Sequence, residues 1–414
     1  MPFRLSGLWR NPDFLKLWAG QTVSVFGSLM GALQLIAILV LDATPFQISV
    51  LAAASVAPAL VAGLSAGAWV DRWRRRPVLI RADLGRALLL ASIPVAYALG
   101  WLRIEQLWAV AFLNGLLAVF FDVAYRAYLP SLVRRDELVE ANSKLSASES
   151  VMEVGAFSLG GWIAQLLSAV AAVAIDAASF LWSAAMLLWI RRPEPRPAAV
   201  APGRSLRQDI VDGLAVVWRE RHLHALAANT LALGLASGMI GATITLFGIR
   251  ELHIQPGVLG TIYAVGGVSS FAGALVAGRV TRAIGFGRAV VLGSLVYGLA
   301  ALLIPAARGP VAVAALFLIG QQLGDGAATI AHVNQVSLRQ AITPASHLGR
   351  VNGSMRFLEM AMTLAGSLLA GAVAEAAGLR VALLVGACAI IAGAVSLWLS
   401  PIWGLKTPPA QTAD

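Results

Sequence analysis

The chain has 414 residues, of which 58% are hydrophobic and only 13% are charged. Soluble domains carry about a quarter charged residues, so this composition excludes an ordinary soluble protein and indicates a polytopic membrane protein. The net charge of +10 does not indicate nucleic-acid binding, because the arginines cluster between apolar runs and do not alternate with aromatic residues. Cys388 is the single cysteine, which leaves no intrachain disulfide and no thiolate metal site.

Apolar runs long enough to cross a bilayer, about 20 residues each, recur twelve times along the chain. The first run is too long for the core of a signal peptide, so we expect it to be retained as a transmembrane helix. We therefore predict an all-α polytopic membrane protein with twelve transmembrane helices. In chain order the predicted spans are 17–41, 48–70, 78–102, 106–130, 144–168, 170–190, 223–249, 256–280, 288–306, 310–335, 350–377 and 379–402.

The arginines and lysines predict the orientation of these spans. With both termini on one side, that side carries 27 of the 31 basic residues if Arg86 and Arg126, at the membrane edge, are counted with it. The positive-inside rule then places both termini in the cytoplasm. The basic residues on the opposite side are Arg103, Arg250, Arg308 and Arg380.

Between the sixth and seventh spans the composition changes, which divides the chain into three parts. Residues 1–190 form an N-terminal six-helix bundle, 191–221 a cytoplasmic linker, and 222–414 a C-terminal six-helix bundle. The linker begins Pro-rich, and from Ser205 its apolar residues recur on one helical face, which predicts an amphipathic helix on the membrane surface. A helix packed under the bundle is the alternative.

The two bundles repeat each other at an offset of about 210 residues. Asn142 matches Asn352, and Glu149 matches Glu359. Glycine and alanine stripes occur in any tightly packed membrane bundle, but they do not explain an acid that recurs at the same offset. Duplication is the better explanation, and two such halves are typical of transporters.

The stretch "GAWVDRWRRRPVLI" at residues 67–80 joins the second and third spans. It resembles the loop signature Gly-x-Leu-Ala-Asp-Arg-x-Gly-Arg-Lys of the major facilitator superfamily. The resemblance implies a latch that holds the halves together on the cytoplasmic side. A functional role for Arg126 of the fourth span would be to meet the acid of this latch. The alternative role for the arginines is to fix topology. The matching residues are Gly67, Asp71, Arg72, Arg75 and Arg76.

Further segments resemble the drug:proton antiporter branch that includes macrolide-efflux and enterobactin-exporter proteins. They are "RNPDFLKLWAGQTVSVFGS", "FDVAYRAYLPSLV", "ELVEANSKLSASESV" and "LGRVNGSMRF". Two positions depart from the pattern of the family. Ala156 stands where export-type members have a proline, and Asn114 stands on the fourth span where many proton antiporters have an arginine.

Ionisable residues within spans are costly and are usually functional or paired. Asp122 and Arg126 lie four residues apart, so they can pair along one helix face for a structural purpose or as part of the latch. Glu149 and Glu153 also lie four apart, and two carboxylates on one apolar face are typical of a group that binds a proton near neutral pH. Glu359 is the repeat mate of Glu149.

Asp325 lies nearest the middle of the tenth span, between two glycines that allow a ligand to approach closely. The resemblance implies that spans 1, 4, 7 and 10 line the central cavity, which makes Asp325 and Gln34 the first candidate contacts. Asp325 would bind a cationic substrate, a proton, or both in competition.

The sequence therefore predicts a secondary transporter, a monomer in the cytoplasmic (inner) membrane, that exports amphipathic small molecules in exchange for protons. The alternative is a siderophore exporter or lysophospholipid flippase on the same fold without proton antiport. An enzyme is not expected, because the chain has no HExxH zinc motif and no nucleophile elbow with partners. No Walker motif occurs, so ATP is not the direct energy source. We expect no cofactor besides the proton, no metal, and no partner besides the substrate and the bilayer.

Overall fold

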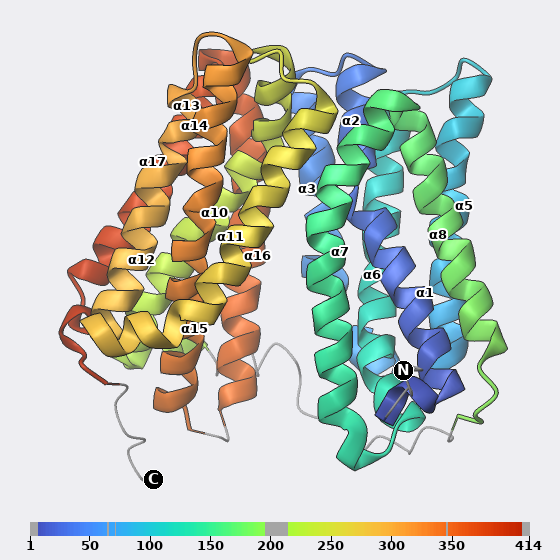
Figure 1. The fold of residues 1–414 in the computed structure, drawn as a ribbon, viewed down its shortest axis with the longest axis horizontal. Helices are drawn as coiled ribbons and strands as arrows, with labels where there is room; N and C mark the ends of the chain where they lie inside the picture. The colour runs from blue at the N-terminus through green and yellow to red at the C-terminus, as the bar shows by residue number, and fades with distance from the viewer. Residues whose placement is uncertain (1–6, 64–65, 71, 195–213, 345–346, 408–414) are drawn as a thin grey trace, which may run out of the picture. The chain divides into compact units, whose positions relative to one another are not determined.

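The computed structural model describes residues 7–63, 66–70, 72–194, 214–344 and 347–407. Every regular element in these ranges is helical (Figure 1). The chain divides into two compact units. Unit 1 comprises Met1–Ala43 and Ala54–Gly203, and unit 2 comprises Thr44–Ala53 and Arg204–Asp414.

The α-helices of the first half of the chain are α1 (Pro12–Leu29), α2 (Ala32–Leu39), α3 (Pro45–Ala62), α4 (Ala66–Val70), α5 (Arg75–Ala98), α6 (Ile104–Leu132), α7 (Leu138–Leu166) and α8 (Ala169–Trp189). Those of the second half are α10 (Arg221–Arg250), α11 (Pro256–Ile284), α12 (Phe286–Ala301), α13 (Leu303–Ala306), α14 (Val311–Leu323), α15 (Asp325–Ile342), α16 (Leu348–Ala377) and α17 (Leu379–Trp398). Short 3₁₀ helices are η1 (Gly7–Arg10), η2 (Arg135–Glu137) and η3 (Pro401–Gly404).

Within the described ranges, ten helical segments are long and apolar enough to cross a membrane, counting α1–α2, α12–α13 and α14–α15 as continuous. Two further helices, α5 with 24 residues and α7 with 29, are long enough but too polar to meet that criterion. Each of the twelve predicted spans overlaps one of these helices. Of the predicted amphipathic helix, residues 214–219 are helical, and the part before them lies outside the described residues.

The first predicted span differs from the structure, because it is interrupted near its middle. The chain leaves α1 at Met30 and enters α2 through Gly31, which has a φ of +63°. A side chain at that φ would be strained, so glycine allows the break. The short turn expected between the fifth and sixth spans is confirmed, since α8 follows α7 after two residues. The Ser168 hydroxyl caps α8 by accepting from the Ala171 N–H at 3.0 Å.

The helix bounds repeat at the offset that the sequence predicts. Adding 210 to the bounds of α7 gives 348–376, and α16 spans Leu348–Ala377. Adding 210 to the bounds of α8 gives 379–399, and α17 spans Leu379–Trp398. Positions 210 residues apart can therefore be compared as equivalent sites in the two halves.

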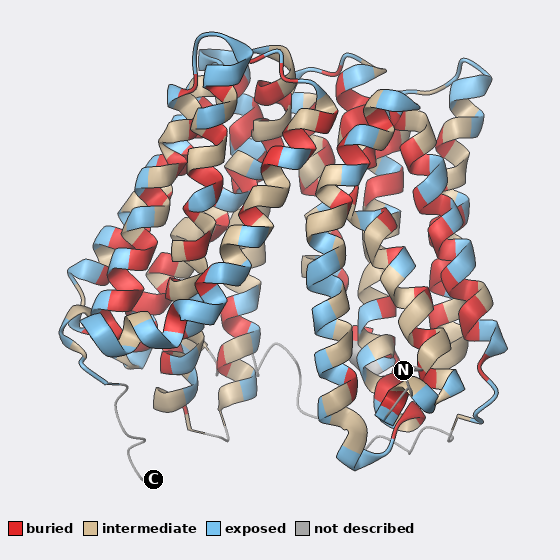
Figure 2. Ribbon diagram, in the orientation of Figure 1, coloured by how far each residue is buried: buried red, intermediate tan, exposed pale blue. Residues whose placement is uncertain are grey.

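Large apolar side chains remain exposed along the helices, as a protein solvated by lipid requires. Leu88 on α5 is 74% exposed and Leu166 on α7 is 71% exposed. Figure 2 shows exposed and half-buried residues along the full length of α7. Two exposed tryptophans lie at helix ends, Trp189 at the end of α8 and Trp398 at the end of α17. This placement is typical of side chains at a membrane–water interface.

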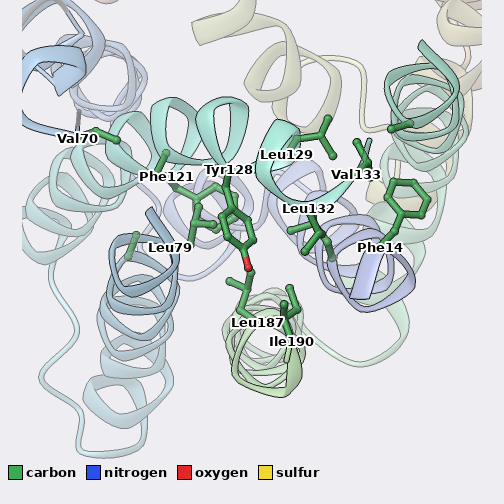
Figure 3. Close-up of a cluster of buried hydrophobic side chains, with 14 of the residues drawn as sticks. Phe14, Val70, Leu79, Phe121, Tyr128, Leu129, Leu132, Val133, Leu187 and Ile190 are labelled. Atoms are coloured by element: carbon green, nitrogen blue, oxygen red, sulfur yellow. The ribbon is translucent and has the colours of Figure 1, made fainter. Parts of the chain in front are cut away.

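A buried cluster in unit 1 fixes the positions of α1, α5, α6 and α8 at one end of the unit (Figure 3). Tyr128 of α6 is 1% exposed and lies among Phe14, Leu79 and Leu187, which come from the other three helices. Phe121, two turns earlier, belongs to the same buried face of α6. Because a helix turns every 3.6 residues, the residues between Phe121 and Tyr128 include some that face away from this cluster.

In unit 2, α10 packs directly against α16 through glycines. A Cβ added to Gly238 would overlap the Thr363 carbonyl oxygen and the Ser367 backbone nitrogen. Small residues at such positions let helix backbones approach closely in lipid, where apolar burial gives little preference for helix association.

We expect Gly238→Ala to lower the free energy of unfolding by about 1–3 kcal/mol, because backbone atoms of α16 cannot move aside as a side chain could. Gly241→Ala on the same helix is the matched control, since a Cβ there would meet nothing within 4 Å. Equilibrium unfolding in mixed micelles measures both variants. Equal stability of the two would contradict the close packing of α10 on α16.

Candidate functional site

Asp325 lines a cavity of about 400 Å³ within unit 2. The carboxylate is half-buried, and its Oδ1 accepts a hydrogen bond of 3.2 Å from the Gln321 amide, a neutral partner. A Cβ on Gly266 of α11 would overlap Asp325 Oδ2, so glycine makes room for the acid. The other polar residues that line this cavity are Ser237, Ser270, Ser294, Tyr297, Thr329, His332, Gln335 and Glu359.

The helix is interrupted at Gly324, just before Asp325. The Ser269 side chain of α11 forms hydrogen bonds to backbone groups on both sides of this break. Its hydroxyl donates to the Leu323 carbonyl at 2.8 Å and accepts from the Gly326 N–H at 3.0 Å. These groups belong to the last residue of α14 and the second residue of α15. The glycines expected to allow a ligand to approach make room for neighbouring helices. A Cβ on Gly326 would press on Ser269 of α11, and one on Gly324 would lie 2.5 Å from the Ala300 Cβ of α12.

A second cavity, of about 370 Å³, lies within unit 1. It collects Asp122 and Arg126 of α6 and Glu149 of α7, three residues that the sequence singled out. Asp122 lies in electrostatic range of both Arg126 and Glu149. Glu153 is exposed one turn further along α7 and is not among the residues that line this cavity.

The cavity of unit 1 has a repeat-equivalent counterpart in unit 2, of about 340 Å³. Asp122, Tyr125 and Arg126 line the first, and adding 210 gives His332, Gln335 and Val336, which line the second. Asn142, Leu145, Ser146 and Glu149 likewise give Asn352, Met355, Arg356 and Glu359. The cavity and one glutamate therefore occupy equivalent positions in the two halves. The other charged residues differ, since His332 and Val336 replace Asp122 and Arg126, and Arg356 replaces Ser146. In unit 2 the Arg356 guanidinium lies 3.4 Å from the Glu359 carboxylate.

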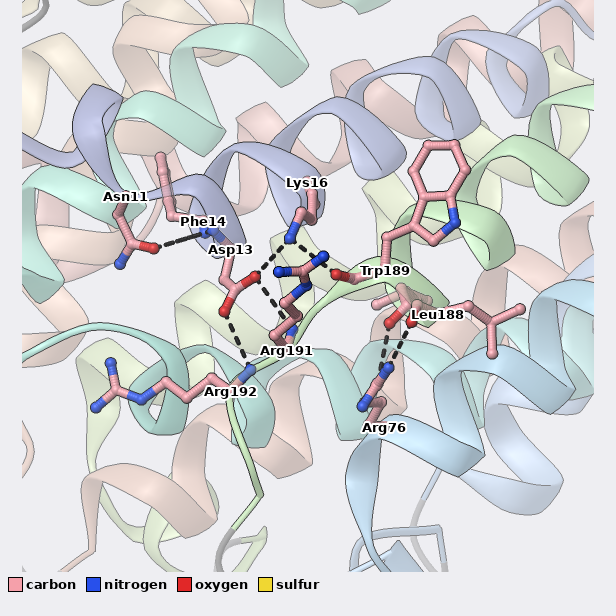
Figure 4. A network of polar contacts seen from close by, with 10 residues as sticks. Asn11, Asp13, Phe14, Lys16, Arg76, Leu188, Trp189, Arg191 and Arg192 are labelled. Carbon is pink, nitrogen blue, oxygen red and sulfur yellow. Dashed lines mark hydrogen bonds and ion pairs between the residues drawn. The ribbon is translucent and has the colours of Figure 1, made fainter.

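The arginine loop between the second and third spans is anchored inside unit 1 (Figure 4). Arg76 donates from Nε to the Leu187 carbonyl at 2.9 Å and from Nη2 to the Leu188 carbonyl at 2.7 Å, which caps the end of α8. The Glu194 carboxylate accepts from the backbone N–H groups of Arg75 and Arg76 at 2.6 and 3.1 Å. It therefore caps the start of α5, where the helix dipole favours an anion.

The chain just after α8 is held by a further acid. Asp13 of α1 accepts from the backbone N–H groups of Arg191 and Arg192 at 3.2 and 3.1 Å, and Lys16 bonds both Asp13 and the Trp189 carbonyl at 2.8 Å (Figure 4). The linker between the halves therefore leaves unit 1 from a fixed point. Asp71, the acid of the predicted latch, lies outside the described residues. Arg72 is exposed.

We expect Arg76→Ala to lower the free energy of unfolding by about 2 kcal/mol, because it removes two charge-assisted hydrogen bonds that satisfy carbonyls at the end of α8. Arg74→Ala is the matched control, since Arg74 is exposed and its side chain makes no capping hydrogen bond to α5. Thermal unfolding in detergent distinguishes the two variants. Equal loss in both would show that the arginines act only through net charge.

Unit 1 contains a cluster of buried charged residues that the sequence analysis did not predict. Asp83 and Arg86 of α5 are 0% and 8% exposed, and Asp176 of α8 is 8% exposed. The Arg86 guanidinium donates to Asn114 Oδ1 of α6 at 3.2 Å and to the Ser28 hydroxyl of α1 at 3.3 Å. Its Cζ lies 3.8 Å from the centroid of the Phe180 ring. We call these six residues the Arg86 cluster.

One expectation about this cluster was wrong. Arg86 was counted at the cytoplasmic edge of the membrane, but it is the twelfth of the 24 residues of α5 and is buried. Its guanidinium lies against Asn114, the position where many proton antiporters of the resembling branch carry an arginine. The signal available in the sequence was an acid and a base three residues apart inside an apolar span, a spacing that places both on one helix face.

Gln34 and Asp325 were both predicted to contact the substrate. They belong to different units: Gln34 is half-buried on α2 in unit 1, and Asp325 lies in unit 2. Their pairing stays a prediction. The roles assigned to Asp122, Glu149, Glu153 and Glu359 also stay predictions, although three of these acids line the cavities described above.

Comparison with known proteins assigns the chain to a family. Residues 17–358 match the profile of the Major Facilitator Superfamily. An uncharacterised MFS-type transporter of Bacillus subtilis, YfiS, is 25% identical over 93% of this chain and 92% of its own length. The multidrug efflux pump Tap of Mycolicibacterium fortuitum is 28% identical over 90% of this chain and 91% of its own.

Solved structures agree on the fold. A mutant of the nucleoside transporter NupG has a TM-score of 0.78 at 14% identity and covers 94% of this chain and 99% of its own. A bacterial homologue of the iron transporter ferroportin has a TM-score of 0.74 at 17% identity and covers 95% and 99%. The chain belongs to the major facilitator superfamily and is a multi-pass membrane transporter.

Proposed function

We propose that this transporter exports amphipathic small molecules, cationic ones above all, in exchange for protons. The observation that carries the proposal is the carboxylate of Asp325, which lines a cavity in unit 2 and has the neutral Gln321 amide as its hydrogen-bond partner. A half-buried carboxylate that is not neutralised by a neighbouring cation can bind either a proton or a substrate cation.

Competition for one carboxylate is sufficient for exchange. A proton that binds Asp325 releases a cation from it, and a cation that binds displaces the proton. Each ligand then shifts the equilibrium between outward-facing and inward-facing states by its difference in affinity for the two. The cavity combines this acid with hydroxyl groups and apolar residues such as Ile390, which suits amphipathic compounds.

The direction of transport rests on relatives. The similar protein from Mycolicibacterium fortuitum is named a multidrug efflux pump, and the match covers nine-tenths of both chains. As a member of a family of transporters the chain is not an enzyme. We extend the efflux activity to it as part of the proposal.

We further propose that α5 and α7 cross the bilayer with the ten apolar spans, which gives twelve crossings and two cytoplasmic termini in the cytoplasmic membrane of a monomer. The charges that make these two helices polar need not face lipid. Asp83 and Arg86 of α5 are buried inside unit 1, and Glu149 of α7 lines a cavity. Ionisable residues at membrane depth are tolerated in such places.

Inverted membrane vesicles that contain the full chain and a pH-sensitive dye test the proposal. A panel of macrolides, cationic dyes and siderophores is added in turn, and proton movement is recorded against vesicles without the protein. We expect amphipathic cations to release protons from the acidified interior. Movement of labelled solute without any proton signal would contradict the proposal and favour a flippase or facilitator.

A further inference from the structure

We propose that Asp83, buried in the Arg86 cluster of unit 1, is a proton-binding site that holds its proton in the conformation described here. The ligand of this site is the proton itself. The inference rests on the proposed proton coupling for its role in transport, and it adds a second proton-binding carboxyl, in unit 1, to Asp325 of unit 2.

The first argument is the isolation of the Asp83 carboxyl. The residue is 0% exposed, and neither of its carboxyl oxygens has a hydrogen-bond partner among the described residues. The Ser183 hydroxyl of α8 faces this carboxyl and interacts with it only weakly, outside the geometry of a full hydrogen bond. An ionised carboxylate in such a position would lose its hydration and gain only the attraction of Arg86 and Ser183 in return, whereas a neutral carboxylic acid avoids most of that cost.

The second argument is that Arg86 is engaged elsewhere. Its guanidinium donates to the neutral Asn114 and Ser28 side chains and lies over the Phe180 ring. Three acids lie in electrostatic range of this one cation: Asp83, Asp176 and Asp122. With Arg86 positive and Asp176 negative, a protonated Asp83 leaves the buried charges balanced. Loss of that proton would leave a net charge of −1 inside the bundle.

Two groups act directly on Asp83: Arg86 on its own helix and Ser183 of α8. The helices packed against α5 also bring two acids within electrostatic range of Arg86, Asp176 of α8 and Asp122 of α6. Asp122 lines the cavity of unit 1 and is exposed, so it connects this buried cluster to water. A proton can therefore reach the cluster from that cavity.

The third argument comes from the repeat. Adding 210 to Asp83, Arg86 and Asp176 gives Gly293, Val296 and Gly386 in unit 2. There the helices close together: a Cβ on Gly293 would lie 2.7 Å from the Ala327 carbonyl oxygen, and one on Gly386 would lie 2.9 Å from Ile240 Cγ1. The fold thus packs the counterparts of Asp83 and Asp176 without any polar group, while Val296, the counterpart of Arg86, is 49% exposed. The charges of unit 1 are not required for the architecture, which indicates a function particular to that half.

The Arg86 cluster joins several helices of unit 1, so the protonation of Asp83 can affect how these helices pack. Asp176 is the eighth of the 21 residues of α8, and a Cβ on Gly27 of α1 would press on its Oδ1. If Asp83 releases its proton, the free carboxylate attracts Arg86 away from Asn114 of α6 and Ser28 of α1. Deprotonation would then loosen α1 and α6 from α5, which gives the proton a means to shift the conformational equilibrium.

Infrared spectroscopy of the purified full chain in detergent tests this site, because a protonated carboxyl has a carbonyl band separate from that of a carboxylate. We expect protonated-carboxyl absorption at neutral pH from which Asp83→Asn removes one band, apart from any contribution of Asp325, and which Glu375→Gln, at an exposed acid of α16, leaves unchanged. An unchanged band in Asp83→Asn would overturn the proposal. The wild-type titration needs no variant: absence of any such band at neutral pH would overturn it equally.

Failure of this site and failure of the proposed function give different results. Proton movement on substrate addition, with the band unaffected by Asp83→Asn, would reject the site and keep the antiport. Loss of the band in Asp83→Asn, with no substrate-linked proton movement for any compound, would keep the proton site and reject the antiport.

Discussion

Asp325→Asn is expected to abolish proton release on addition of substrate to inverted vesicles, and to reduce uphill export to the level of vesicles without the protein. The amide keeps the size of the side chain and its bond to Gln321, but it can neither bind a proton nor attract a cation. Coupling fails because the two ligands no longer compete for one charge. The loss is in coupling, so exchange of a neutral labelled compound across the membrane should persist.

Glu375→Gln is the matched control for this result. Glu375 is an exposed acid of α16 in the same unit, so its loss removes the same formal charge without touching the cavity. It should leave proton release and export within a factor of about two of wild type. Retention of full proton release in Asp325→Asn would show that another carboxyl carries the coupling.

Arg86→Met is expected to lower the free energy of unfolding by about 3–5 kcal/mol, whereas Asp83→Asn should cost under about 1 kcal/mol. Removal of the guanidinium leaves Asp176 as a buried charge without compensation and frees the Asn114 amide. Asparagine at position 83 replaces one neutral group by another of the same shape if the acid is protonated. Equilibrium unfolding in mixed micelles measures both.

Leu88→Met is the control for this pair, because Leu88 lies on the same helix and is 74% exposed to lipid. It should not change stability beyond error. Equal destabilisation by Asp83→Asn and Arg86→Met would mean that the two residues form an ionised pair, which contradicts a protonated Asp83.

Much of the fold was predictable from the sequence because lipid imposes simple constraints on length and polarity. Each of the twelve predicted spans overlaps a helix, and the bounds of α7 and α8 recur in α16 and α17 at an offset of 210. The break at Gly31 was not predicted, since a glycine in an apolar run is compatible with a continuous helix as well as with a left-handed turn.

The candidate site was only partly predictable, because hydropathy and local patterns do not show which residues of different helices meet. Asp122, Arg126 and Glu149 were each identified from their position in a span, and the structure brings them to one cavity. Arg86 was assigned to the membrane edge because hydropathy cannot distinguish a basic residue that points to water from one that pairs inside a bundle. Glu194 as the cap of α5 depends on a contact 119 residues away in the chain, which local patterns do not contain.

The measurement that tests proton-coupled export most directly uses purified protein in liposomes with an imposed pH difference. The steady-state ratio of a labelled monovalent cationic substrate across the membrane is recorded as that difference is varied, with the membrane potential clamped. For exchange of one proton per cation, the ratio should change about tenfold for each pH unit, because one pH unit corresponds to about 1.4 kcal/mol. A ratio that stays at one for every imposed pH difference would contradict the account.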